Sequence, residues 1–381
     1  MPDTHALLSA SSAHRWLSCT PSARLERGFP DRETEAAMEG TAAHALAEHK
    51  LKKALGMPTV RPISGYDSGE MEECTDDYVS FVMELVARAK AEHGGDPVVL
   101  VEQRLDFSEW VPEGFGTGDC VVVSDGTLSV VDLKYGTGVV VEAEENSQMK
   151  LYALGALRLF EALYDIREVS MTIFQPRRRN VSTWKEPVSD LLRWADGELK
   201  EKAALAYKGE GACKPGSWCV FCRASPRCRA RADENLRLAE MEFRKPPLLT
   251  DSEVEKVLSR IPTLTKWAGD VAGYALDEAL ANGKRWKGFK VVEGRSVRRY
   301  RDEKAVADAA GKAGFTDVWR RSLIPITEMQ RLMGRSRFEE VLGGLVFKPP
   351  GKPTLVPVTD KRPEMEPAEA GNEFNEIKED N

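Results

Sequence analysis

The spacing of apolar residues predicts alternating helices and strands over more than half of the chain. Apolar positions three to four residues apart, typical of a buried helix face, recur in residues 9–25, 35–55, 76–93, 145–163 and 187–206. Short β-branched runs, typical of strands, occupy residues 98–105, 120–123, 127–133, 169–175 and 181–186. This order favours an α/β fold with a mixed central sheet flanked by helices.

Two of the expected strands are joined by Asp125-Gly126, a strong local signal for a β-hairpin. The second strand of this hairpin ends in Asp132, Leu133 and Lys134. Side chains two residues apart in a strand point to the same face. We therefore expect Asp132 and Lys134 to share one face of the hairpin and Leu133 to point to the other.

Two carboxylates and a lysine at one end of a hairpin suit the cleavage of a phosphodiester. Asp119 begins the first strand in a Gly-flanked position that a ligand could approach closely. Asp119 and Asp132 could hold Mg²⁺ or Mn²⁺, which prefer oxygen ligands, and such an ion polarises a phosphate and activates water. Lys134 would orient that water or neutralise developing charge. The alternative is a surface hairpin with one salt bridge, because Asp-x-Lys alone is common.

Two expected helices carry polar residues one turn apart. His44 and Glu48 share a face of one helix, and Gln148 and Tyr152 share a face of another. A lone helical His is more often a packed or exposed residue than a metal ligand. His44 is therefore a candidate ligand only if other ligand-type residues lie near it.

Cysteines are concentrated in one short stretch. Four of the seven, of which the last three have the spacing C-x2-C-x5-C, are Cys213, Cys219, Cys222 and Cys228. In a reducing compartment such a group indicates ligands of Zn²⁺ or of an iron–sulfur cluster rather than disulfides. Cys19 lies at the end of the first expected helix. A single cysteine there is typical of a small buried hydrophobic residue.

Composition narrows the class of protein. The 381 residues suffice for one large domain or two ordinary ones, and 42% hydrophobic with 30% charged residues fits a soluble globular protein. A net charge of −7 argues against a protein that coats nucleic acid by bulk charge. We see no run long enough to span a bilayer and no secretory signal, so we expect a cytoplasmic protein without membrane contact.

The last third of the chain differs in character from the rest. Residues 251–282 are expected to be helical, and shorter helices are expected at 302–313, 327–333 and 337–342. Aromatic residues between lysines at 284–290 are compatible with a nucleic-acid surface or with an ordinary amphipathic strand. The expected division is a core at residues 1–232, an α-rich extension at 233–358 and a disordered acidic tail at 359–381.

Together, these pieces resemble the RecB-like branch of the PD-(D/E)xK nuclease superfamily over about residues 9–232. Each motif is weak alone, but four occur in the order of that family. They are Gly-x-x-x-His at Gly40 and His44, Gly-Asp at Gly118 and Asp119, Asp-x-Lys at Asp132 and Lys134, and Gln-x-x-x-Tyr at Gln148 and Tyr152.

The resemblance implies a restriction-endonuclease-like core with a mostly helical C-terminal extension, and a metal-dependent DNA nuclease activity. Lys134 would be the catalytic lysine, and Gln148 and Tyr152 would contact DNA or order the site. Many members of the superfamily have Glu where this chain has the shorter Asp132. The implied ligands of Mg²⁺ or Mn²⁺ are His44, Asp119, Asp132 and the backbone carbonyl of Leu133. Glu102, on the preceding strand, would contact these ligands rather than the ion.

The cysteines extend this resemblance. AddB-type and CRISPR-associated nucleases of this branch carry a [4Fe–4S] cluster held by one Cys before the nuclease motifs and three after them. The matching residues are Cys19, Cys219, Cys222 and Cys228. Such a cluster would join the first helix to the end of the core and close a very long loop. Cys213 is then surplus, and a local Zn²⁺ site built from Cys213 and the three later cysteines remains the alternative.

Residues 351–363 resemble, less specifically, a phage- and prophage-borne family of unknown function. That suggests phage replication or recombination in a bacterial host cell. We therefore expect an exonuclease acting on single-stranded DNA or DNA ends, with a helicase or recombinase as the candidate partner. The alternatives are a catalytically inactive nucleic-acid-binding or assembly module on the nuclease fold, and an iron–sulfur redox sensor.

Overall fold

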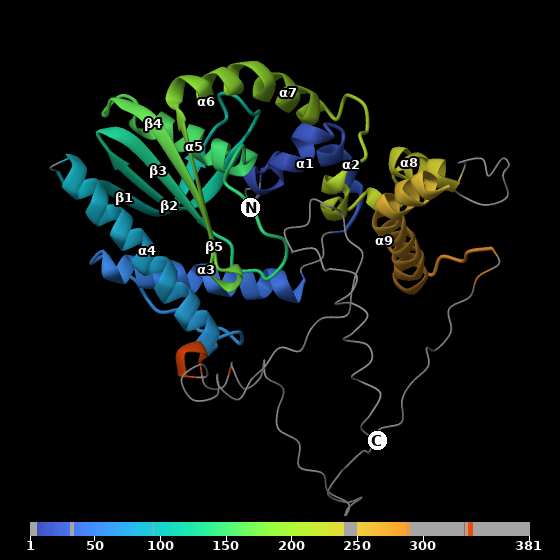
Figure 1. The fold of residues 1–381 in the computed structure, drawn as a ribbon, viewed down its shortest axis with the longest axis horizontal. Coiled ribbons are helices and arrows are strands. Elements are labelled where there is room, and N and C mark those ends of the chain that lie inside the picture. Colours follow the sequence, from blue (N-terminus) through green and yellow to red (C-terminus); the bar gives the residue numbers. More distant parts are fainter. Residues whose placement is uncertain are drawn as a thin grey trace, which may run out of the picture.

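A five-stranded mixed sheet runs through the computed structural model (Figure 1), in the order β1-β2-β3-β4-β5. The model describes residues 6–30, 34–93, 95–239, 250–287, 289, 331 and 334–337. All adjacent strands are antiparallel except β3 and β4, which are parallel. The expected α/β class with a mixed sheet flanked by helices is confirmed. The strands are β1 (Val98–Asp106), β2 (Phe115–Ser124), β3 (Gly126–Leu133), β4 (Ile166–Gln175) and β5 (Asn180–Pro187).

The predicted hairpin is formed by β2 and β3. Ser124 pairs with Thr127 across the turn at Asp125-Gly126. Gly126 has a φ of 85°, a conformation that favours glycine. Because β3 and β4 are parallel, the chain must cross over between them, and α5 (Ser147–Phe160) makes that crossover.

Helices cover both faces of the sheet. α5 packs on one face, together with the N-terminal helices and with α6 (Val188–Trp194) and α7 (Lys200–Lys208). The other face carries α3 (Glu35–Ala54) and α4 (Gly69–His93). α6 and α7 form one helical run through a π-turn at Ala195–Leu199, close to the single helix expected at 187–206.

Three expected boundaries were wrong. β2 begins at Phe115 rather than at residue 120, so Asp119 lies inside the strand and not at its start. The helix expected at 9–25 is split into α1 (Ala13–Ser18) and α2 (Ser22–Leu25), because Cys19 leaves the helical conformation with a φ of −135° and a ψ of 85°, and Pro21 has no backbone N–H to continue the helix. α4 begins at Gly69 rather than at residue 76. There the Ser68 hydroxyl accepts the backbone N–H of Met71 and caps the added turns.

The described C-terminal part is helical. α8 (Arg229–Ala239) packs against α9 (Asp251–Asn282), where Arg231 lies 2.7 Å from Asp270. α9 matches the helix expected at 251–282. The helix expected at 302–313, and most of those at 327–333 and 337–342, fall outside the described residues, as does the expected acidic tail. Within the described part of the chain, no helix has the length and hydropathy needed to span a bilayer.

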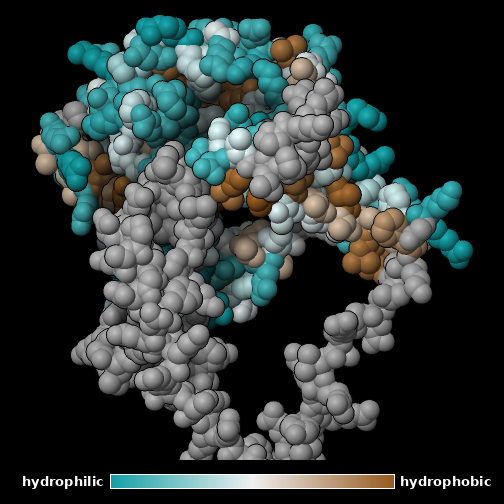
Figure 2. Space-filling model, turned by 45° about the vertical axis from the view of Figure 1, so that its right-hand side comes forward, coloured by the Kyte–Doolittle hydropathy of each residue, from teal (hydrophilic) through white to brown (hydrophobic). Residues whose placement is uncertain are grey.

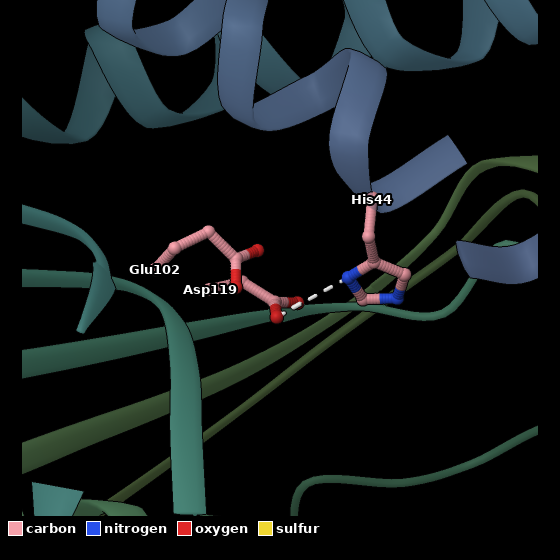
Figure 3. A group of neighbouring side chains, drawn as sticks. All are labelled: His44, Glu102 and Asp119. Atoms are coloured by element: carbon pink, nitrogen blue, oxygen red, sulfur yellow. Dashed lines mark ion pairs between the residues drawn. The ribbon is translucent and has the colours of Figure 1, made fainter. Parts of the chain in front are cut away.

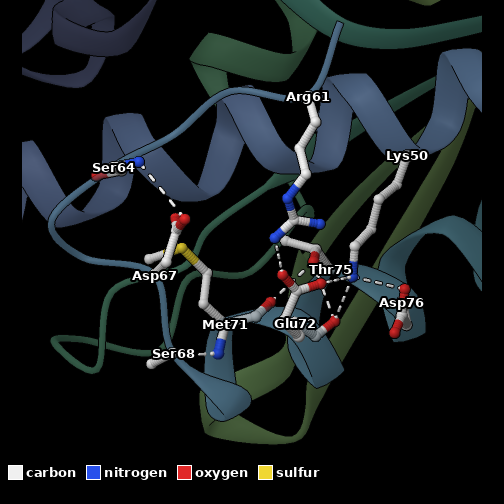
Figure 4. Close-up of polar contacts among 9 residues, drawn as sticks. All are labelled: Lys50, Arg61, Ser64, Asp67, Ser68, Met71, Glu72, Thr75 and Asp76. Atoms are coloured by element: carbon white, nitrogen blue, oxygen red, sulfur yellow. Dashed lines mark hydrogen bonds and ion pairs between the residues drawn. The ribbon is translucent and has the colours of Figure 1, made fainter.

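A polar network holds α3 against α4 (Figure 4). The Lys50 ammonium on α3 lies 2.7 Å from the Glu72 carboxylate and 2.6 Å from Asp76, both on α4. Arg61, from the connecting loop, also contacts Glu72. Lys50 additionally donates to the Glu72 carbonyl at 2.8 Å. Because this lysine is largely buried, the network fixes the position of α3 over the sheet, and α3 carries His44.

On the opposite face, α5 approaches β1 closely at Gly155. A Cβ at this position would lie 2.8 Å from the Leu105 Cβ and 3.1 Å from the Leu105 carbonyl carbon. Helical Gly40 on α3, by contrast, has no neighbour within 4 Å of such a Cβ. The two glycines therefore form a matched pair.

We expect Gly155→Ala to lower the free energy of unfolding by about 1–3 kcal/mol, because the added methyl overpacks the contact with β1. Gly40→Ala should raise it by about 0.5–1 kcal/mol, since alanine is the better helix former and meets nothing. Urea unfolding of both variants and the wild type would measure this difference. Equal effects of the two substitutions would contradict the close packing.

Candidate functional site

Asp132 and Lys134 lie on one face of β3, as the sequence predicted. Lys134 Nζ is 2.8 Å from Asp132 Oδ2. Gln148 on α5 donates from Nε2 to Asp132 Oδ1 at 3.0 Å and contacts the Tyr152 hydroxyl at 3.2 Å. Leu133 points the other way, into the apolar layer under α3 and α4. The Asp-x-Lys and Gln-x-x-x-Tyr motifs therefore meet through Asp132.

A second group of ligand-type side chains lies beside β2 (Figure 3). His44 Nδ1 on α3 is 3.2 Å from Asp119 Oδ1. The other carboxylate oxygen, Asp119 Oδ2, accepts the backbone N–H of Leu133 at 2.6 Å. Glu102 on β1 completes the group, and the three donor atoms lie within 4.8 Å of one another. In the described part of the chain, no other set of three or more such groups was found this close.

Glu102 reaches this group because β1 is irregular there. Val101 pairs with Cys120 and Gln103 with Gly118, so Glu102 lies across from Asp119. Glu102 has a φ of 51°, which is uncommon for a residue with a side chain. Backbone strain of this kind is often concentrated at functional sites.

The irregularity also shifts the alternation of side chains along β1. Leu100 packs in the main core under α5, and so does Leu105, five residues later. In a regular strand these two positions would face opposite sides. The shift lies between them, at Glu102, and leaves its carboxylate on the side of Asp119 and His44.

Burial and charge together set the pKa values of this group. Burial of the His44 imidazole opposes its protonation, but the Asp119 carboxylate outweighs it and raises the pKa of His44 to about 9. Burial likewise opposes ionisation of Asp119, but His44 reverses that effect and holds the pKa of Asp119 below its usual value. The two side chains therefore form an ion pair at neutral pH in the metal-free protein.

The other two carboxylates are harder to ionise. Burial, followed by the charge of Asp119, raises the pKa of Glu102 to about 7. Burial also raises the pKa of Asp132, and Lys134 offsets only part of this effect. Burial opposes protonation of Lys134, but the Asp132 carboxylate outweighs it and raises the pKa of the lysine.

These groups fit a divalent cation chemically. Carboxylate oxygens and one imidazole nitrogen are suitable ligands for Mn²⁺ or Mg²⁺. Asp132 Oδ2 is buried and makes no properly oriented hydrogen bond, although the Lys134 ammonium lies beside it. The side chains of His44 and Asp119 are 32% and 12% exposed, so an ion could reach them from solvent.

The predicted ligands all lie near Asp119, but their contacts with one another differ from those that the sequence predicted. His44 and Asp119 are in direct contact, and Asp132 is close enough to influence the charge of both. Glu102, which the sequence placed behind the ligands, lies directly against Asp119. The local sequence contains no signal for the positive φ that turns it there. The only available signal was a carboxylate on the preceding strand.

The cysteines also gather in space. Burial raises the pKa of the Cys213 thiol to about 11, and the nearby thiols of Cys19 and Cys228 add to this shift. Cys219 lies within electrostatic range of Cys19 and Cys228, and Cys222 within range of Cys219. Both alternatives drawn from the sequence therefore have their thiols present, because Cys19 and Cys213 reach the same place.

Contacts outside the cysteines fix this arrangement. The Glu26 carboxylate, 3% exposed, lies 2.6 Å from the Arg15 guanidinium and accepts the backbone N–H of Arg223 at 2.7 Å. Arg15 also donates to the carbonyl of Phe221 at 2.9 Å. The N-terminal helices are thereby tied to the loop that carries Cys219 and Cys222.

Comparison with known proteins identifies a family. The family model described as "Protein of unknown function (DUF2800)" matches residues 5–363, so the chain belongs to this family. A solved structure titled "Crystal structure of SSO0001" is 12% identical, over 55% of this chain and 94% of that chain, with a TM-score of 0.22. A likeness this weak bears on neither fold nor function.

We expect Glu102→Gln to weaken Mn²⁺ binding by at least about tenfold, because it removes a charged donor from the group around Asp119. Glu109→Gln is the matched control, since Glu109 is exposed on the loop after β1. Isothermal titration of the purified proteins with Mn²⁺ would measure both affinities. If the two variants bound Mn²⁺ equally well, Glu102 would have no part in a metal site.

Proposed function

We propose that this member of the DUF2800 family is a metal-dependent DNA nuclease of the PD-(D/E)xK type, acting on single-stranded DNA or DNA ends. The observation that carries the proposal is the buried pair of Asp132 and Lys134 beside the ion pair of Asp119 and His44. Four separate motifs of the sequence supply these groups and Gln148.

A structural salt bridge is a poorer explanation of the same residues. Moving an ion pair out of water is costly, and well-packed apolar side chains often serve stability as well or better. Here Asp132 is buried, and its Oδ2 lacks a properly oriented hydrogen bond. A buried carboxylate oxygen with unused acceptor capacity is suited to binding a cation.

The proposed metal ligands come from several elements of the fold. His44, Asp119 and Asp132 would hold Mg²⁺ or Mn²⁺ together with the carbonyl of Leu133, and Glu102 is placed to join them. When bound, such an ion polarises the scissile phosphate and lowers the pKa of a water molecule. The proposed ligands therefore come from α3 and from three adjacent strands.

The remaining groups position the reactants. Lys134 would hold the attacking water and offset negative charge that develops on the phosphate. Gln148 fixes the orientation of the Asp132 carboxylate by donating to its Oδ1. Tyr152, which contacts Gln148, would restrain that amide or contact the DNA strand.

The cysteine site fits a thiolate-bound metal group, for which we propose a [4Fe–4S] cluster with a structural role. Zinc–sulfur bonds of about 2.3 Å would bring four sulfurs within about 4 Å of one another. No three cysteines of the described chain meet a limit of 4.8 Å. The proposal of a cluster rather than Zn²⁺ rests on the match of Cys19, Cys219, Cys222 and Cys228 to the cysteine pattern of [4Fe–4S] nucleases. Redox sensing alone would leave the Asp132 group unexplained.

The proposed setting is phage replication or recombination in the cytoplasm of a bacterial host, with DNA as substrate and a helicase or recombinase as a possible partner. This setting rests on the resemblance of residues 351–363, which lie outside the described structure.

We expect protein purified without oxygen to cut DNA in the presence of Mn²⁺ or Mg²⁺, and Lys134→Ala to slow cutting at least about a hundredfold, because it removes charge stabilisation at the phosphate. Lys185→Ala is the matched control, since Lys185 is an exposed lysine on β5 that pairs with Glu168. Single- and double-stranded DNA labelled at the 5′ or 3′ end would report rate and polarity.

Cutting that is equal in the wild type and Lys134→Ala would come from another enzyme and would contradict the proposal. DNA binding without cutting, unchanged by Asp132→Ala, would instead favour the inactive binding module. The two labels distinguish an exonuclease, which shortens DNA from one end, from an endonuclease.

A further inference from the structure

The cysteine site holds one thiol more than a four-ligand metal group needs. Cys213 lies outside the C-x2-C-x5-C spacing, yet the segment before it is bonded to Thr20, next to Cys19, and the thiols of Cys19 and Cys228 both add to the raised pKa of Cys213. Those two residues are the first and the last of the four expected ligands. Cys213 therefore lies at the site rather than on its periphery.

Backbone contacts, and not only the thiol itself, hold Cys213 next to Cys19. The hydroxyl of Thr20 donates to the carbonyl of Glu210 at 2.6 Å. At Gly211 the φ is 102°, and a Cβ there would collide with the Thr20 hydroxyl. The chain just before Cys213 can follow this path only because residue 211 is glycine.

A third contact secures the same segment from the other side. Arg24 donates from Nε to the carbonyl of Tyr207 at 2.6 Å, and its guanidinium lies 4.9 Å from the centre of the Tyr207 ring. The residues just after Cys19 and those leading to Cys213 are thus joined at two points. The proximity of the two thiols follows from the fold and needs no metal to create it.

Cys222 has different surroundings. Its chain neighbours Phe221 and Arg223 are bonded to Arg15 and Glu26, whereas the segment that leads to Cys213 is bonded to Thr20 and Arg24. A replacement thiol must reach the vacated coordination position, which is possible only for a neighbour. Cys213 therefore has access to the positions of Cys19 and Cys228 and not to that of Cys222.

We propose that Cys213 is a reserve ligand of the metal group, able to take the place of Cys19 or Cys228 but not of Cys222. This inference rests on the thiolate-bound group of the proposed function. The exchange is a substitution without a change of oxidation state: the Cys213 sulfur loses its proton and binds the metal, while the departing sulfur takes up a proton. It would keep the site filled when one ligand is damaged.

The test compares metal content across variants with and without the fifth thiol. Cys213→Ser, Cys19→Ser, Cys228→Ser and Cys222→Ser would be purified as full chains without oxygen, together with the double variants Cys19→Ser/Cys213→Ser and Cys228→Ser/Cys213→Ser. Iron, acid-labile sulfide and zinc per chain, with the visible absorption spectrum, would be measured for each. Cys74→Ser, at a buried cysteine on α4, controls for the loss of any buried thiol.

We expect Cys213→Ser, Cys19→Ser and Cys228→Ser to keep at least about half of the wild-type metal, and Cys222→Ser and both double variants to lose nearly all of it. The proposal is overturned if Cys19→Ser and Cys228→Ser lose as much metal as the doubles. It is equally overturned if Cys213→Ser alone empties the site, since Cys213 would then be an obligatory ligand.

A second measurement uses only the wild type and so does not depend on whether a variant folds. Alkylation of the native, metal-loaded chain followed by mass spectrometry should modify Cys213 ahead of the other four thiols. Protection of Cys213, with another of the five modified, would contradict its reserve role. A wild type without iron, sulfide or zinc would remove the metal group itself, whereas DNA cutting is measured separately.

Discussion

Two carboxylates held at neighbouring positions of a dry sheet are the constraint around which this fold is built. Asp132 on β3 is buried and the Asp119 side chain on β2 is only 12% exposed, and an unmatched charge in such a place is strongly destabilising. His44 on α3 matches the charge of Asp119, and Lys134, the residue after the end of β3, matches that of Asp132. Gln148 adds a hydrogen bond from the opposite face. Helical layers on both faces are therefore needed to keep the pair ionised and in place.

The parts of this arrangement that depend on local periodicity could be predicted from the sequence. The shared face of Asp132 and Lys134 follows from the two-residue repeat of a strand, and the hairpin follows from Asp125-Gly126. The place of Glu102 could not be predicted, because it depends on a positive φ that only the surrounding sheet imposes. A propensity-based interpretation assumes regular strands, so it did not place the Glu102 carboxylate among the metal ligands.

The cysteine site shows the same limit over a longer distance. Spacing along the chain predicted metal-ligand chemistry but allowed two ligand sets, one with Cys19 and one with Cys213. The choice depends on contacts such as that between Thr20 and Glu210, which are 190 residues apart. No local pattern reports such a contact. In three dimensions the two sets overlap, because the same tertiary contacts bring Cys19 and Cys213 to one place.

The two sites are connected through the N-terminal segment. The 3₁₀ turn at Ala10–Ser12 leads into α1, which ends beside Cys19. A Cβ at Gly116 would lie 2.8 Å from the Tyr152 ring and 3.5 Å from the Ala10 Cβ, so this turn covers the residue that contacts Gln148. Fixing Cys19 in the proposed metal group would therefore also hold the turn that packs near Gly116 and Tyr152. The proposed cluster would in this way support the proposed chemistry at Asp132 without exchanging electrons with it.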